Sequence, residues 1–153
     1  MQNAVASCFG HRTVFHNVSE ALHASIEELI TQHNVKTFMT GGMGDFDGQF
    51  ASAVRGFQRQ YKDIKLVLVK PYFSNELNTN KYYYETVYDD VIIPDVLTGV
   101  HPKSAITKRN RWMVENSDLI IAYVHRDYGG AYTAVKYAYK IDKQVINLAE
   151  NGR

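Results

Sequence analysis

The chain has 153 residues and a formal net charge of +1, with 45% hydrophobic and 22% charged residues. This length and composition are typical of one globular domain with its own core, so we expect a single domain over residues 1–153 and exclude a disordered chain. Because Lys and Arg outnumber Asp and Glu by only 17 to 16, no strong overall field draws the protein to nucleic acid or to an anionic membrane.

The cysteine content and the N-terminal residues bear on the compartment in which the protein works. A single cysteine, Cys8, excludes an internal disulfide framework and a Cys-rich zinc site. The first residues carry no basic segment followed by a long apolar run. The longest apolar stretch, 119–124, is far too short to cross a bilayer. We therefore expect a cytoplasmic protein with no membrane partner.

Strand-like and helix-like segments alternate along the chain, as runs of β-branched residues and apolar residues at helical spacing indicate. The expected strands cover residues 3–9, 35–40, 64–69, 91–93, 119–124 and 145–148. The expected helices cover residues 21–30, 47–61, 104 or 107 to 116, and 131–141, with a loop and one short helix within 74–88. This order predicts an α/β fold with a doubly wound, mostly parallel sheet of five or six strands.

Two glycine-rich turns each follow an expected strand and open an expected helix. The first covers residues 40–47 and the second covers residues 128–133. A strand that passes through glycines into a helix leaves backbone N–H groups at the positive end of the helix dipole, and this geometry holds a phosphate or another anion. Since open α/β folds bind ligands at the carboxyl ends of their strands, we expect the two turns to flank one pocket.

Polar side chains near these turns are further candidates. Residues 10–12 follow the first strand, and an arginine there offers a fork of N–H donors to a phosphate or carboxylate. His11 stays open between a general acid, a hydrogen-bond donor to a ligand and a simple turn residue. Asp47 serves either a ligand or the free N–H groups of the helix start. Because Arg109 and Arg111 are two apart on a helix, at most one of them is expected to reach the pocket.

Four motifs, in this order along the chain, resemble a known family. Residues 8–12 look like the strand-end Gly-His-Arg of the YpsA-like branch of the SLOG superfamily, and residues 41–47 are similar to its glycine turn with an acid at the helix head. Residues 109–122 resemble the segment in which a basic helix leads into the last core strand. Residues 128–138 occupy the place of the second, phosphate-binding turn. The superfamily is the Rossmann-like group that also holds DprA and the Lonely-guy phosphoribohydrolases.

The resemblance implies one Rossmann-like domain that binds a nucleotide or a nucleotide-derived signal, such as an ADP-ribose-like molecule, and acts as a sensor or a sequestering protein. The glycine turns and the resemblance together predict these ligand-binding residues: Gly10, His11, Arg12, Gly41, Gly42, Met43, Gly44, Asp45, Asp47, Arg109, Gly129, Gly130, Ala131 and Thr133.

An enzyme that cleaves or transfers at the N-glycosidic bond of a nucleotide is the alternative. In the Lonely-guy enzymes a glutamate follows the second turn, whereas here no carboxylate lies between Asp127 and Asp142. Cleavage of a ribosyl–base bond needs a carboxylate near the oxocarbenium-like centre, so we place binding ahead of catalysis. For the alternative, the charge would come from another loop, through Asp45, Asp47, Glu85, Asp89 or Asp90.

Three expectations concern partners. The near-zero net charge argues against binding of single-stranded DNA in the manner of DprA, so nucleic acid is not expected as a partner. The histidines outside the turns show no metal-ligand spacing, and we predict neither a metal nor a cofactor. Related SLOG proteins are commonly dimers or larger, and a homo-oligomer is expected here, with an aromatic contact surface that draws on Tyr82, Tyr83, Tyr84, Tyr88 and Trp112. Stacking on a base is the alternative for the four tyrosines.

Overall fold

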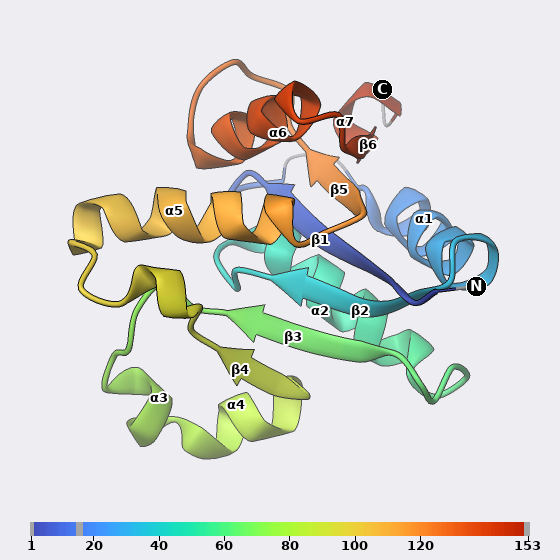
Figure 1. The fold of residues 1–153 in the computed structure, drawn as a ribbon. Helices are drawn as coiled ribbons and strands as arrows, with labels where there is room; N and C mark the ends of the chain where they lie inside the picture. Colours follow the sequence, from blue (N-terminus) through green and yellow to red (C-terminus); the bar gives the residue numbers. More distant parts are fainter. Residues whose placement is uncertain (1, 15–16, 152–153) are drawn as a thin grey trace.

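The structure is a computed structural model and describes residues 2–14 and 17–151. Six strands within these residues form one all-parallel sheet in the order β4-β3-β2-β1-β5-β6 (Figure 1). The strands are β1 (Ala4–Gly10), β2 (Val35–Thr40), β3 (Lys65–Val69), β4 (Asp90–Ile92), β5 (Leu119–Tyr123) and β6 (Gln144–Asn147). The predicted α/β, doubly wound, parallel architecture is therefore confirmed.

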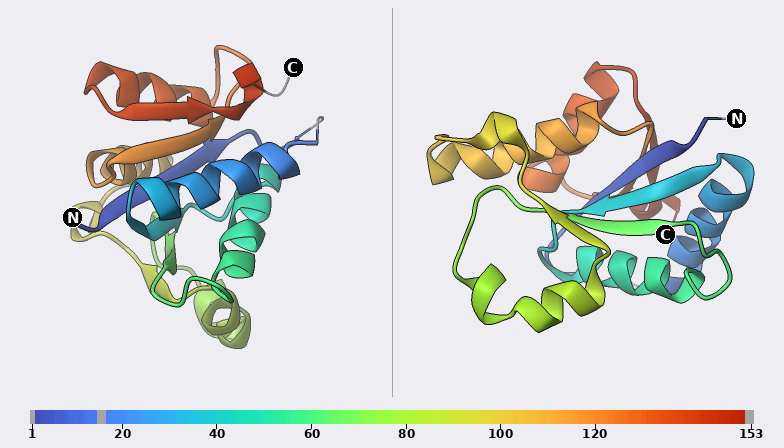
Figure 2. Two further views of the ribbon diagram at one scale, coloured as in Figure 1. Left: turned by 90° about the vertical axis from the view of Figure 1, so that its right-hand side faces the viewer. Right: turned by 60° about the horizontal axis from the view of Figure 1, so that its bottom comes forward.

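Helices cover both faces of the sheet. They are α1 (Ser19–Gln32), α2 (Asp45–Phe57), α3 (Glu76–Thr79), α4 (Lys81–Val87), α5 (Pro102–Glu115), α6 (Gly130–Lys140) and α7 (Leu148–Asn151), with a 3-10 turn at Asp95–Leu97. Helices α1 and α2 lie on one face, and α5 and α6 lie on the other (Figures 1 and 2). Right-handed crossovers require this arrangement, because the chain extends the sheet on one side of β1 and then on the other.

The core has two layers, one on each face of the sheet. Side chains of a strand alternate between the faces. In β1, Ala6 and Cys8 pack in the layer of α1 and α2, whereas Phe9 packs in the layer of α5 and α6. Both layers extend to the carboxyl ends of β1 and β5. Their packing therefore holds in place the loops that follow these two strands.

The tyrosine-rich segment differs from the expectation of a loop with one short helix. It forms two short helices, α3 and α4, and the Tyr84 N–H donates to the Asn80 carbonyl where they join. Tyr84 is buried, while Tyr82 and Tyr83 are 83% and 55% exposed. The homo-oligomer that this segment suggested stays a prediction.

Strands β1 and β5 are the neighbours at which the strand order reverses. From β1 the chain proceeds through β2, β3 and β4 to one edge, and from β5 it proceeds to β6 at the other. Adjacent loops at such a point lead to opposite faces and leave a crevice between them, which is where open α/β sheets bind ligands. In the part of the chain that the structure describes, no helix is long and apolar enough to cross a membrane.

Candidate functional site

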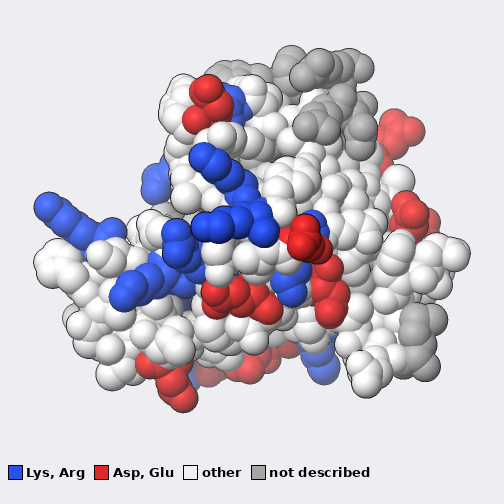
Figure 3. Space-filling model, turned by 45° about the horizontal axis from the view of Figure 1, so that its top comes forward, with Lys and Arg blue, Asp and Glu red and all other residues white. Residues whose placement is uncertain are grey.

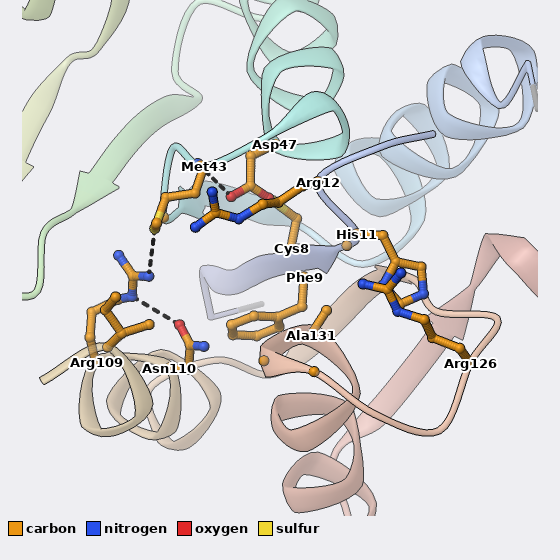
Figure 4. Close-up of a pocket in the computed structure, with 15 residues that line it drawn as sticks. Cys8, Phe9, His11, Arg12, Met43, Asp47, Arg109, Asn110, Arg126 and Ala131 are labelled. Carbon is orange, nitrogen blue, oxygen red and sulfur yellow. Dashed lines mark hydrogen bonds between the residues drawn. The ribbon is translucent and has the colours of Figure 1, made fainter. Parts of the chain in front are cut away.

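A cavity of about 380 Å³ opens at the carboxyl ends of β1, β2 and β5 (Figure 4). Its volume falls within the range of about 300–1,000 Å³ that is usual for small-molecule sites. The residues that line it are Cys8, Phe9, Gly10, His11, Arg12, Gly41, Met43, Asp47, Ile106, Arg109, Asn110, Arg126, Gly129, Gly130 and Ala131.

The cavity brings together residues of both glycine turns. From the first turn it includes Gly41, Met43 and Asp47, and from the second it includes Gly129 and Gly130. Of the predicted ligand-binding residues, those on the cavity are Gly10, His11, Arg12, Gly41, Met43, Asp47, Arg109, Gly129, Gly130 and Ala131. Their contact with a ligand stays a prediction.

Two predicted glycines lie off the cavity and shape the first turn. Gly42 has a φ of 70°, and a Cβ there would lie 2.7 Å from Cδ1 of Leu68. Gly44 has a φ of 93°, and a Cβ there would lie 2.6 Å from the Arg12 Cα. Both positions need glycine, because the backbone is left-handed and the space is already filled.

Asp45 and Thr133 also lie off the cavity. One carboxylate oxygen of Asp45 accepts a hydrogen bond from the Val14 N–H at 3.2 Å, which ties the β1–α1 loop to the start of α2. The Thr133 hydroxyl donates to the Gly129 carbonyl at 2.9 Å, which secures the first turn of α6. Both side chains therefore serve the backbone of the two turns.

Asp47 closes the first glycine turn from inside helix α2. Its Oδ2 accepts the Met43 N–H at 2.9 Å, and its Oδ1 accepts the Cys8 thiol at 3.4 Å. Burial raises the pKa of Asp47 to about 6, against the opposing effects of the Met43 N–H, the Cys8 thiol and the Arg109 charge. Of the two roles open for Asp47, the observed contacts match the one that satisfies free N–H groups near the helix start.

Arg109 is a buried guanidinium held from three sides. Its Nη1 donates to the Val69 carbonyl at 2.9 Å, its Nε donates to Oδ1 of Asn110 at 2.9 Å, and its Nη2 contacts Sδ of Met43 at 3.6 Å. A Cβ on Gly41 would come within 3.0 Å of its Cζ. A side chain at this position would therefore press on the guanidinium, which lies in close contact with the first turn.

No carboxylate pairs with Arg109 in the described part of the chain. The ion pairs there with N–O distances up to 4.0 Å are Lys36–Asp63 and Lys81–Glu85, and neither lies on the cavity. The Arg109 side chain is only 3% exposed, and burial lowers its pKa despite the nearby Asp47 charge. A buried cation of this kind is costly unless an anion pairs with it.

His11 acts as a hydrogen-bond acceptor for the neighbouring loop. Its Nε2 accepts the His125 N–H at 3.1 Å, so the ring proton lies on Nδ1. Burial lowers the pKa of His11 to about 4, and the Arg126 charge and the neighbouring His125 act in the same direction. The imidazole is therefore neutral near pH 7 and joins the ends of β1 and β5.

Five lining residues were not among the predicted site residues: Cys8, Phe9, Ile106, Asn110 and Arg126. Arg126 follows β5 as Arg12 follows β1, so its place at the carboxyl edge was a usable signal. Its Cζ lies 4.7 Å from the centroid of the Tyr128 ring. In Figure 4 Arg109 and Arg126 lie on opposite sides of the view, with Phe9 and Ala131 between them. The cavity thus carries three arginines, from α5 and from the loops after β1 and β5.

Comparisons with known proteins agree with these motifs. A model of the YspA SLOG family matches residues 10–150. The chain is 26% identical over 138 residues to the uncharacterised SPbeta prophage-derived protein YoqJ of Bacillus subtilis (strain 168), covering 80% of this chain and 81% of that protein.

Two solved structures of DNA processing protein A, DprA, share the fold. For the protein from Streptococcus pneumoniae the TM-score is 0.64 at 15% identity, covering 94% of this chain and 49% of that one. For the protein from Helicobacter pylori the TM-score is 0.64 at 16% identity, covering 93% of this chain and 63% of that one. The chain thus spans about half of the first DprA and under two thirds of the second.

The expectation that nucleic acid is no partner is wrong. The Helicobacter pylori DprA, which has this fold, binds single-stranded DNA. The net charge sums the whole molecule and does not report how charge is distributed over one face. Helix α5 carries Lys103, Lys108, Arg109 and Arg111 with no acid before Glu115.

The chain belongs to the YpsA family of SLOG proteins, because the family model matches residues 10–150. The two glycine turns and the cavity at the ends of β1 and β5 agree with this assignment.

Proposed function

We propose that the protein binds a nucleotide or a nucleotide-derived signal, such as an ADP-ribose-like molecule, in the cavity between the two glycine turns, and acts as a sensor or a sequestering protein. One observation carries the proposal: Arg109 is buried on the cavity wall with no carboxylate partner among the described residues. A phosphate group would supply the missing negative charge, and Arg holds phosphate with paired N–H donors.

The second glycine turn supports a phosphate at the same place. Gly129 has a φ of 98°, and helix α6 begins at the next residue. The first N–H groups of a helix have no acceptor within the helix and lie at the positive end of its dipole. The turn carries no acid before Asp142. The backbone N–H groups and the arginines therefore all contribute positive potential to one cavity.

The positions and contacts of the carboxylates favour binding without turnover over N-glycosidic cleavage. Asp47 is the only carboxylate on the cavity wall in the described chain, and both of its oxygens accept hydrogen bonds from the protein. Asp45 lies off this cavity, and Glu85, Asp89 and Asp90 line a different one beside α4 and β4. The one wall carboxylate in the described chain thus holds the first glycine turn, which favours binding over N-glycosidic cleavage.

Mass spectrometry of the small molecules released from the denatured protein tests this proposal. We expect an intact nucleotide or nucleotide derivative, and we expect the same compound to remain intact after incubation with fresh protein. Recovery of a free base and a sugar phosphate would instead support the hydrolase. If none of the nucleotides tested binds the purified protein in calorimetry, the proposal is contradicted.

A second candidate function is binding of single-stranded nucleic acid along the face that α5 and α6 form. Neither Lys103 to Arg111 nor helix α6 contains an acid. Figure 3 shows Lys and Arg side chains gathered in a band, with Asp and Glu side chains beside it. Phosphate contacts from such a surface supply most nucleic-acid affinity, whatever the total charge of the protein. The exposed basic residues of the two helices are Lys103, Lys108, Arg111, Lys136 and Lys140.

Fluorescence anisotropy with a labelled single strand tests this second candidate. Lys108→Glu with Lys136→Glu should weaken binding and reduce its dependence on salt, because each lost phosphate contact lowers the number of released counterions. Lys62→Glu is the control, since Lys62 is exposed in the turn between α2 and β3. Equal effects of the double variant and the control would rule out this face.

A further inference from the structure

The aromatic residues on the cavity wall offer little surface to a base. They are Phe9 and His11, and both are buried, so neither presents an open ring face to a ligand. The tyrosines of α4 do not supply one either, because Tyr84 and Tyr88 line a separate cavity beside α4 and β4. An aromatic partner for a base in the cavity between the glycine turns therefore has to lie at its rim.

Tyr128 lies at this rim. It is the first residue of the second glycine turn and directly precedes Gly129, which lines the cavity. Tyr128 is 63% exposed. Single exposed aromatic residues are common on protein surfaces, so exposure alone identifies no site. The position of the ring beside a residue of the cavity wall is the more specific observation.

Arg126 connects this ring to the cavity. Its Cζ lies 4.7 Å from the centroid of the Tyr128 ring, and its Nη2 would lie 3.8 Å from a Cβ on Gly129. Arg126 also lines the cavity itself. The guanidinium and the ring, which we call the Arg126–Tyr128 pair, thus continue the cavity wall outward. Guanidinium planes and aromatic rings are the two kinds of protein surface on which bases stack.

The opposite side of the second turn faces helix α5. Nδ2 of Asn110 would lie 3.9 Å from a Cβ on Gly130. In Figure 4 Asn110 and Arg126 lie on opposite sides of Ala131. A phosphate held at the start of α6 therefore has α5 on one side and the Arg126–Tyr128 pair on the other. The side of the pair is the more open one, because its two residues are exposed whereas Asn110 is half-buried.

We propose that the base of the bound nucleotide stacks on the Arg126–Tyr128 pair. This rests on the proposed nucleotide-binding function and adds a base subsite at the rim of the same cavity. Stacking uses the face of a base rather than its hydrogen-bonding edge, so the subsite tolerates every base. The base belongs either to a free nucleotide or to one nucleotide of a single strand.

Calorimetry with ADP and with inorganic pyrophosphate separates the base from the phosphates. We expect the unsubstituted protein to bind ADP about five- to a hundredfold more tightly than pyrophosphate, which is the range that stacking of one base supplies. Tyr128→Leu should remove most of this difference and leave the affinity for pyrophosphate unchanged. Tyr128→Phe keeps the ring and should keep the affinity for ADP.

Tyr139→Leu is the matched control. Tyr139 is 54% exposed in the last turn of α6 and does not line the cavity, so both affinities should stay unchanged. The base subsite is overturned, and the proposed function stands, if Tyr128→Leu binds ADP as tightly as the unsubstituted protein or loses affinity equally for ADP and pyrophosphate. If neither compound binds the unsubstituted protein, the proposed function fails together with the subsite.

Fluorescence tests the stacking contact directly. Tyr128→Trp places an indole ring at the subsite, and the unsubstituted protein, whose only tryptophan is Trp112, gives the background signal. Saturating ADP should quench the added emission, whereas saturating pyrophosphate should not, because it has no base. The same response to both compounds would contradict stacking.

A labelled single strand distinguishes the two sources of the base. If the strand binds in anisotropy measurements, is displaced by ADP and binds Tyr128→Leu more weakly, the base belongs to a strand. A strand that does not compete with ADP identifies the free nucleotide as the ligand.

Discussion

The Arg109 guanidinium on α5 donates to the Val69 carbonyl at the end of β3 across 2.9 Å, which joins a helix on one face to the carboxyl edge of the sheet. The same group touches Met43 in the first glycine turn. One buried side chain thus holds the cavity wall together and presents a positive charge to it. Stability and ligand affinity are therefore coupled at this residue.

Arg109→Ala should weaken both properties. It removes the donor to a buried carbonyl, which costs about 1–3 kcal/mol of unfolding free energy, and a charged contact to phosphate, which costs about ten- to a hundred-fold in affinity. Urea unfolding measures the first loss and calorimetry with ADP measures the second. Unchanged values in both measurements would show that the guanidinium has neither role.

Arg12→Ala should separate the two effects. The Arg12 side chain is exposed and lines the cavity. Its loss should therefore weaken ligand binding by about ten- to a hundred-fold and leave the melting temperature nearly unchanged. A variant that unfolds at a clearly lower temperature with no separate binding defect would make Arg12 a structural residue.

Gly10→Ala should destabilise the protein strongly. A Cβ at this position would lie 2.4 Å from Cγ of Phe46, which is fully buried, and overpacking of this kind costs about 1–3 kcal/mol or more. Gly48→Ala is the matched control, because Gly48 lies in α2 with nothing within 4 Å of its Cβ position. That change should stabilise the helix by about 0.5–1 kcal/mol. Chemical denaturation of the pair checks both signs.

Asp47→Asn should change how stability depends on pH. The pKa of Asp47 is about 6 in the folded protein and about 3.9 in an unfolded chain. The folded state therefore binds the proton more tightly than the unfolded chain does. The stability that protonated Asp47 contributes is fully present below about pH 4 and is lost as the pH rises through 6. The loss is on the order of 3 kcal/mol. The Asn variant should lack this loss in urea titrations between pH 4 and 7; an identical profile would contradict the assignment.

His11→Gln should change the same profile in the opposite direction. The pKa of His11 is about 4 in the folded protein and about 6.5 when unfolded. The stability that the neutral ring contributes is present above pH 6.5 and lost as pH falls towards 4. Glutamine keeps an acceptor for the His125 N–H without titrating. The variant should therefore lose less stability on acidification, as measured by urea unfolding at each pH, and a steeper loss would contradict the prediction.

The local signals in the sequence were sufficient for the fold and for the edge of the sheet at which the cavity lies. The aliphatic run at 64–69 identified a strand buried on both faces, and the glycine turns after two strands indicated the edge at which the cavity lies. Helical spacing also predicted that at most one of Arg109 and Arg111 reaches the pocket. In the structure Arg109 lines the cavity, whereas Arg111 lies over the Tyr137 ring at 4.9 Å. These features can be predicted from the residue spacing within a single helix or strand, because side chains repeat on one face with a fixed period.

The division of roles among the site residues was decided only by the tertiary structure. In the sequence, Gly42 and Gly44 cannot be distinguished from Gly41, since all three are glycines of the first turn. In the structure they lie against Leu68 and Arg12 rather than on the cavity. Asn110 gave no signal, because its amide gains a role only from the Arg109 side chain beside it and the glycine turn opposite. Hydrogen-bond partners between distant segments depend on how the strands and helices pack, and no spacing along the chain encodes them.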